Sequence, residues 1–165
     1  MNNNVFLPAD ILLPKNADFS KWAVIACDQF TSQRDYWEKA YSLVGDEVSA
    51  LHLVFPEVYL EDGDAAGRIE AINRNMEKYL QEGIFEEYKD AMILTERTLA
   101  DGRARRGLVG AFSLEDYSFE KDAKPLIRPT EGTVLSRIPP RVNIRRDAAL
   151  ELPHIMVLMD DRDRE

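Results

Sequence analysis

An amphipathic stretch in the middle of the chain constrains its fold more than any other pattern. Its apolar side chains recur at the three- and four-residue spacing of one helical face: Ile69, Ile72, Met76, Tyr79 and Leu80. Asp62 and Asp64 precede the stretch as capping residues, and Gly83 follows it as a stop signal. A helix with one apolar face packs that face against other elements. The pattern therefore predicts a core-covering helix, with Ile69, Ile72, Met76 and Leu80 facing the core.

Three short apolar runs predict β-strands. Each is rich in strand-forming residues and is bounded by polar residues or proline, which is typical of a buried strand. The runs are residues 22–27 (WAVIAC), 51–55 (LHLVF) and 154–159 (HIMVLM).

The other segments add a second helix and a hairpin to this set. Residues 36–44 follow helical spacing after a capping pair, Ser32 and Asp35, and Gly45 ends the pattern. A turn signal, Asp101-Gly102-Arg103, separates two further strand-like runs and predicts a hairpin. Three segments complete the prediction: an irregular arm over 1–21, a short helical turn over 84–88, and an arginine-rich loop after 127. We expect an α/β (α+β) fold, a mixed sheet with flanking helices, in a single domain over residues 1–165.

Composition narrows the classes of function. The chain has 30 acidic and 21 basic residues and a net charge of -9, which argues against general affinity for nucleic acid or anionic membranes. Its one cysteine, Cys27, excludes an internal disulfide and a four-cysteine zinc site. No apolar run approaches the roughly 20 residues that span a bilayer. We expect a cytoplasmic protein whose partner is a small-molecule metabolite or a nucleotide, with no membrane or direct nucleic-acid binding. Homo-oligomerisation stays open.

Five arginines gather in one segment of this acidic chain: Arg128, Arg137, Arg141, Arg145 and Arg146. Arginine presents a planar, permanently charged fork of donors that grips carboxylates and phosphates in a bidentate way. The cluster predicts either an anion site, with Arg128, Arg137 and Arg141 as phosphate ligands, or a salt-bridge network that ties two elements together.

Within this segment, Glu131 lies beside Gly132 and between Thr130 and Thr133. Neighbouring hydroxyls orient a carboxylate, and arginines hold an anionic co-substrate, so Glu131 is a candidate general base and Thr133 a candidate substrate ligand. The alternative is a turn in which Glu131 pairs with a nearby arginine.

Two further places are candidates for chemistry. Asp28 and Gln29 follow the predicted strand 22–27 and precede a helix, where α/β proteins often bind ligands, although helix capping also explains them. Asp160 and Asp161 follow the run 154–159, and two adjacent carboxylates are able to bind Mg²⁺ together with water and phosphate oxygens. Solvated aspartates at a strand end are the alternative.

Three long sequence segments resemble those of a known family: WAVIACDQFTSQRDYW (22–37), RPTEGTVLSRIPPRVNIRRDA (128–148) and ELPHIMVLMDD (151–161). With them the chain resembles the bacterial domain-of-unknown-function family ten-fifteen over essentially its whole length. Members of that family are typically longer, so the chain resembles their N-terminal portion. Their Asp-Gly-His-His-Arg-like motif likens them to the ParB–sulfiredoxin superfamily, which includes free-serine kinases.

The resemblance implies an α/β fold and phosphoryl transfer to a small hydroxylated metabolite such as serine, with ATP or ADP and Mg²⁺ as cofactors. Related subfamilies have a His-Glu-x-Thr element where this chain has Thr130 to Thr133, so the histidine is replaced here. The Asp-Gly-His-His-Arg motif is absent from the 165 residues, which implies an incomplete catalytic site. The alternative is a ParB-like, non-catalytic module that binds a nucleotide or a protein.

Overall fold

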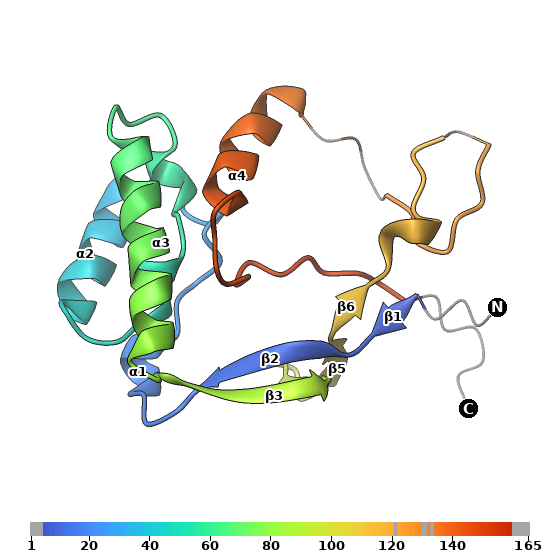
Figure 1. Cartoon of the computed structure of the whole chain (residues 1–165), viewed down its shortest axis with the longest axis horizontal. Helices are drawn as coiled ribbons and strands as arrows, with labels where there is room; N and C mark the ends of the chain where they lie inside the picture. The colour runs from blue at the N-terminus through green and yellow to red at the C-terminus, as the bar shows by residue number, and fades with distance from the viewer. Residues whose placement is uncertain (1–4, 121, 130–131, 133, 160–165) are drawn as a thin grey trace. The chain divides into compact units, whose positions relative to one another are not determined.

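A computed structural model describes residues 5–120, 122–129, 132 and 134–159 of the chain (Figure 1). The chain forms two units, and each unit is assembled from two separate stretches of sequence. Unit 1 comprises Met1–Lys15 and Phe85–Val134, and unit 2 comprises Asn16–Ile84 and Leu135–Glu165. Every β-strand of the described residues lies in unit 1 and every α-helix in unit 2, which confirms a mixed α/β (α+β) fold. The single domain over 1–165 stays a prediction.

Unit 2 is helical. Its elements are α1 (Phe19–Trp22), α2 (Arg34–Val44), the 3₁₀ turns η1 (Ala50–Leu53) and η2 (Glu57–Tyr59), α3 (Ala65–Gln81), the 3₁₀ turn η4 (Leu135–Arg137) and α4 (Ile138–Arg145). The second predicted helix is confirmed as α2, which ends at Gly45 with a φ of 58°. Its predicted capping pair is wrong, because the N-cap is Gln33 and makes no side-chain capping bond. The arginine-rich segment is also not only a loop, since it contains α4, with Pro139 and Pro140 in the first turn, where proline is tolerated.

The amphipathic stretch forms α3, the long green helix in Figure 1. Of the four side chains predicted to face the core, Ile72 and Met76 are buried and Ile69 is partly buried. Tyr79 of the same apolar face is also buried. Leu80 does not face the core, because 40% of its surface is exposed. The chain leaves the helix at Gly83, whose φ of 65° is accessible to glycine without strain.

The core of unit 2 packs between these helices and the segment 49–55. Its largest buried side chains are Trp37, Leu51, Leu53, Phe55, Tyr59, Ile72, Met76 and Tyr79. Ser49 is also fully buried; its hydroxyl donates to the Lys21 carbonyl (2.6 Å) and accepts from the Leu51 amide (3.1 Å). The predicted strand over 51–55 is wrong, because this serine caps the 3₁₀ turn η1. The apolar composition of residues 51–55 correctly predicted their burial. Burial alone does not determine whether the backbone forms a strand or a helix.

Unit 1 contains three two-stranded antiparallel sheets among its described residues, in place of the single mixed sheet that was predicted. They pair β1 (Phe6–Leu7) with β6 (Ala111–Phe112), β2 (Ala9–Pro14) with β3 (Phe85–Ala91), and β4 (Ile93–Thr98) with β5 (Ala104–Val109). The last pair is the predicted hairpin, closed by a bond from the Leu99 amide to the Arg103 carbonyl (2.8 Å).

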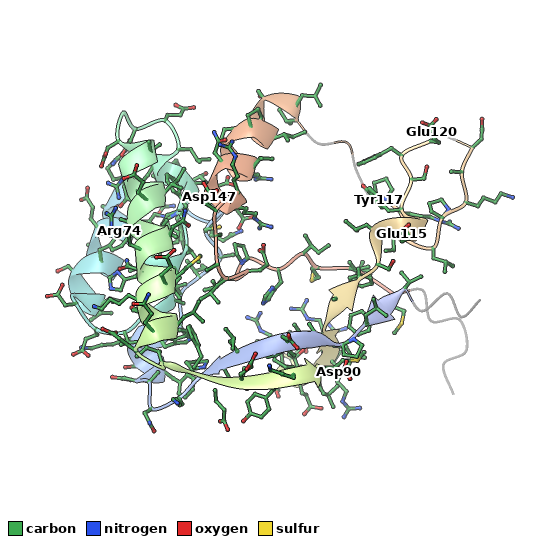
Figure 2. The ribbon with its side chains drawn as sticks, viewed as in Figure 1. Arg74, Asp90, Glu115, Tyr117, Glu120 and Asp147 are labelled. Carbon is green, nitrogen blue, oxygen red and sulfur yellow. The ribbon has the colours of Figure 1, made fainter. Side chains whose placement is uncertain are left out.

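Two predictions about unit 1 are wrong. The arm over 1–21 contains β1 and β2, and residues 84–88 enter β3 instead of a helical turn. Within β3, Asp90 adopts a φ of 51° and its amide donates to a carboxylate oxygen of Asp10 (3.2 Å), so a side chain supports the irregular part of this pair (Figure 2).

Two predicted buried strands in unit 2 do not form. Residues 23–26 are not helix or strand, and residues 154–159 are largely exposed, with Leu158 83% exposed. A strand needs a hydrogen-bonding neighbour, and in the described part of the chain no strand pairs with either run. No helix within the described residues is long and apolar enough to cross a membrane.

Candidate functional site

The arginines of the C-terminal cluster are divided between the two units. Arg128 belongs to unit 1, where its Nε donates to the Pro125 carbonyl (3.1 Å). In unit 2, both Nε and Nη2 of Arg141 donate to Oε1 of Glu57, at 3.1 and 2.7 Å. Arg145 contacts the Pro153 carbonyl (2.9 Å) and the Glu151 carboxylate (3.1 Å). Arg146 donates to the side-chain oxygen of Asn143. These internal pairs are the arrangement expected of a structural network, and the phosphate-binding role stays a prediction.

Several predicted site residues lie outside the described residues. They are the candidate base Glu131, the candidate ligand Thr133, and the candidate metal ligands Asp160 and Asp161. The side chain of Arg137 is not described either.

Asp28 and Gln29 form an exposed turn in unit 2. The Gln29 amide donates to the Ala26 carbonyl (3.0 Å), and its side chain reaches Asp28 Oδ1 at 3.4 Å. The preceding residue, Cys27, accepts a bond at its carbonyl from the Glu57 amide (2.8 Å). Because the carboxylate of Glu57 holds Arg141, Glu57 links two segments that the sequence marked separately.

The thiol of Cys27 is poorly suited to nucleophilic chemistry. Burial raises its pKa above the ordinary value, and the negative charges of Asp28 and Glu57 raise it further. A thiol with a raised pKa contains little thiolate at neutral pH, and the thiolate is the nucleophile.

Unit 2 also contains a pocket of about 170 Å³ that none of the sequence motifs indicated. Aliphatic and aromatic side chains form much of its wall, including Leu51, Phe55 and Ile72. The polar residues that line it come from α2, η1, η2 and α3: Tyr41, His52, Tyr59, Arg68 and Asn75. An apolar wall with a few convergent polar groups is typical of a small-molecule site.

Two of these polar residues have a buried atom without a hydrogen-bond partner. Among the described residues, nothing pairs with Nε2 of His52 or with Nε of Arg68. His52 is held in place through its backbone, because the Asn75 side-chain amide donates to its carbonyl (3.3 Å). An unpaired buried polar group costs roughly 1–3 kcal/mol, and such groups are rare enough in folded proteins to need an explanation.

The two arginines beside the pocket, Arg34 and Arg68, differ in whether a carboxylate pairs with them. Arg34 makes a bidentate pair with Asp62 at 2.6 and 3.1 Å, and this pair lowers the pKa of the Asp62 carboxyl. Arg68 contributes only a weaker electrostatic effect on Asp62. Within the described ranges, no carboxylate lies within 4.0 Å of Arg68.

Tyr41 and Tyr59 supply hydroxyl groups that stay protonated at neutral pH. Burial is the largest cause that raises the pKa of each tyrosine above its ordinary value of 10.0. Both hydroxyls are therefore able to donate hydrogen bonds.

The family model described as "Protein of unknown function (DUF1015)" matches residues 7–165, nearly the whole chain. The chain belongs to the DUF1015 family. No curated protein and no solved structure matches it. The likeness to the ParB–sulfiredoxin superfamily stays a prediction.

The described residues of this DUF1015 chain contain no group of three or more His, Cys, Asp or Glu side chains that could hold a metal ion. The sequence also has no glycine-rich phosphate loop. The described part of the chain thus offers a pocket for a small molecule, and the magnesium–nucleotide site stays a prediction.

Sequence reasoning missed the pocket of this DUF1015 member for a physical reason. His52 fell in a predicted strand, Tyr41 was assigned to an apolar helix face, and Arg68 was one of many charged residues. Only tertiary packing brings them to one pocket. No local pattern in the sequence distinguishes Arg68 from the other charged residues of this helix.

Proposed function

We propose that this chain binds a small hydroxylated metabolite such as serine, and that it serves phosphoryl transfer to that metabolite. The observation that supports binding is the pocket of unit 2, in which His52 and Arg68 each keep a buried polar atom unpaired among the described residues. Protein atoms cover both of these nitrogens, so a polar ligand has to displace that cover before it supplies the hydrogen bonds that the protein itself lacks. Binding would then offset part of the cost of burying them.

The reaction class rests on the family resemblance. Phosphoryl transfer depends on alignment and neutralisation of charge more than on covalent catalysis. In this proposal Glu131 is the general base, Arg128, Arg137 and Arg141 hold phosphate, and Asp28, Gln29 and Thr133 position the substrate. Asp160 and Asp161 would hold Mg²⁺ with ATP or ADP.

The pairing of Arg141 with Glu57 bears on the assignment of Arg141 as a phosphate ligand. An arginine already held by a carboxylate has to give up that partner before it binds phosphate, and the Glu57 side chain is partly buried, at 15% exposed. This cost favours metabolite binding over complete catalysis as the function of the described residues. A non-catalytic binding module is therefore the second candidate.

Nuclear magnetic resonance tests metabolite binding directly, because the chain has only two histidines, His52 and His154. Serine, phosphoserine, ATP and ADP are titrated separately, with and without Mg²⁺, while both imidazole signals are observed. We expect serine to shift the His52 signal and to leave the His154 signal in place. Equal movement of both signals, or of neither, would count against the pocket.

A matched pair of variants separates a pocket effect from a general loss of charge. Arg68→Gln removes the pocket arginine, and Arg74→Gln removes an exposed arginine of the same helix that contacts only Glu70, at 3.6 Å, in the described structure (Figure 2). We expect Arg68→Gln alone to weaken serine binding.

Turnover is tested separately. Serine is incubated with Mg²⁺ and either ATP or ADP, and phosphoserine is measured for the wild type and for Glu131→Gln. Production that Glu131→Gln abolishes supports phosphoryl transfer and the assigned base. Serine binding without any turnover supports the non-catalytic module.

A further inference from the structure

Two arginines stack on the same aromatic ring beside the pocket. The guanidinium carbon of Arg68 lies 4.1 Å from the centre of the Tyr59 ring, and that of Arg34 lies 4.9 Å from it. The ring itself is buried. These contacts restrain the position of both guanidinium groups, because the face of an aromatic ring attracts a cation.

The two guanidinium groups differ at their edges. Stacking uses the face of the plane and leaves the N–H groups of the edge to make hydrogen bonds. The two terminal nitrogens of Arg34, Nη1 and Nη2, donate hydrogen bonds to the two carboxylate oxygens of Asp62. Arg68 has no carboxylate in reach among the described residues, and its Nε is buried without a partner. The pair of Arg34 with Asp62 thus shows the kind of ligand that the edge of Arg68 lacks.

Charge decides between the anions that an arginine fork can bind. A fork accepts either a carboxylate or a phosphate group. A phosphate monoester carries about -1.5 to -2 charges at neutral pH, whereas a carboxylate carries one. Arg34 is already neutralised by Asp62, so Arg68 supplies a single positive charge to the pocket. A singly charged anion balances the one positive charge of Arg68. A second negative charge on the ligand is unfavourable, because the chain already has a net charge of -9.

Size limits the ligand further. An apolar cavity of about 150 Å³ accommodates benzene, which has six heavy atoms. The pocket of about 170 Å³ is partly open to solvent, so the part of a ligand that it encloses has about six to eight heavy atoms. The aliphatic wall from Leu51 and Ile72 favours a short carbon chain, while His52 and Tyr41 offer polar groups to a hydroxyl or an amino substituent.

We propose that the pocket of unit 2 binds a short monocarboxylate with a hydroxyl or amino substituent, and that Arg68 holds its carboxylate. This inference rests on the proposed metabolite-binding function and names the charged group that the metabolite must carry. It assigns Arg68 as the main determinant of specificity, with Tyr59 and Asp62 as the groups that hold the two arginines in place.

Three small probes of similar size test the inference without any mutation. Lactate carries a carboxylate and a hydroxyl, lactamide replaces the carboxylate by a neutral amide, and methylphosphonate carries a tetrahedral phosphonate. Each is titrated into the 165-residue chain while the His52 imidazole signal is followed. We expect lactate to bind at least about tenfold more tightly than lactamide, because a charge-assisted bidentate pair is lost in the amide.

Variants then locate the carboxylate. Arg68→Gln should weaken lactate binding by about tenfold or more and remove most of the preference over lactamide, whereas Arg74→Gln should change neither. Retained near-ultraviolet circular dichroism shows that each variant is folded. If Arg68→Gln unfolds, the comparison of lactate with lactamide on the wild type still decides the question.

The outcomes separate this inference from the function on which it rests. Tighter binding of lactate than of both other probes supports the monocarboxylate. Preferential binding of methylphosphonate at His52 overturns the monocarboxylate and leaves a small-anion pocket standing. Equal binding of lactate and lactamide overturns the role of Arg68. If neither serine nor any probe moves the His52 signal, both proposals fail.

Discussion

Replacement of Tyr79 by phenylalanine tests how unit 2 is held together. The Tyr79 hydroxyl accepts a hydrogen bond from the backbone amide of Ser49 at 3.1 Å, and Ser49 is fully buried. Tyr79→Phe keeps the ring but leaves that amide without its acceptor. Since a buried unpaired donor costs roughly 1–3 kcal/mol, we expect the free energy of unfolding to fall by about that amount.

Tryptophan fluorescence during urea denaturation is a suitable assay, because both tryptophans, Trp22 and Trp37, lie in unit 2. With a slope of about 1–3 kcal/mol per molar urea, a loss of 2 kcal/mol should lower the midpoint by roughly 1 M. The control is Tyr88→Phe, which removes the hydroxyl of an exposed tyrosine in unit 1 and should leave the midpoint almost unchanged. An unchanged midpoint for Tyr79→Phe would refute the reasoning, as would an equal shift for the control.

Three other predictions follow from the same unit. Ile72→Ala removes part of a buried side chain of α3 and should lower the free energy of unfolding by about 2–4 kcal/mol, measured by the same fluorescence assay. Arg34 lowers the pKa of Asp62 in the folded chain, so the stabilisation is fully present above the ordinary value of 3.8 and is lost as the pH falls through the lowered value. The stability difference between the wild type and Asp62→Asn should therefore shrink below about pH 4, and a constant difference would contradict the pair. Cys27 has a raised pKa, so at pH 7.5 iodoacetamide should alkylate it far more slowly in the folded chain than in urea; equal rates would show an accessible, ordinary thiol.

The sequence predicted those elements whose signals are local. The spacing of Ile72 and Met76 and the stop at Gly83 determine α3 within a few turns of the chain. The hairpin of β4 and β5 follows in the same way from its turn residues. Both signals depend on neighbours in sequence, and tertiary packing did not override them.

The strand predictions were wrong where they rested on apolar composition alone. The run 51–55 is buried as expected, but a serine cap turns part of it into a 3₁₀ helix. The run 154–159 is as apolar, yet it is extended chain without a strand partner among the described residues. Conversely, β3 was not predicted as a strand, because its sequence FEEYKDA is mostly charged. The strand is exposed over most of its length. Strand formation depends on a partner that composition does not reveal.

The pocket lies where no predicted motif lies, and the phosphate-binding role of the arginine cluster stays a prediction. Of the two arginines beside the pocket, Arg34 has a carboxylate partner in Asp62, whereas Arg68 in α3 has none in the described structure. Arg141 and Arg145, which the sequence emphasised, have carboxylate partners in Glu57 and Glu151. Pairing of a charge is a property of the tertiary structure, so a count of arginines along the chain does not predict which one is available to a ligand.

A crystal structure of the chain with bound lactate or serine tests the central claim most directly. We expect ligand density in the pocket of unit 2, with a carboxylate within hydrogen-bonding distance of the edge of Arg68 and a second polar group near His52. Density for the ligand at another place, or an empty pocket in crystals grown at a saturating ligand concentration, would contradict it.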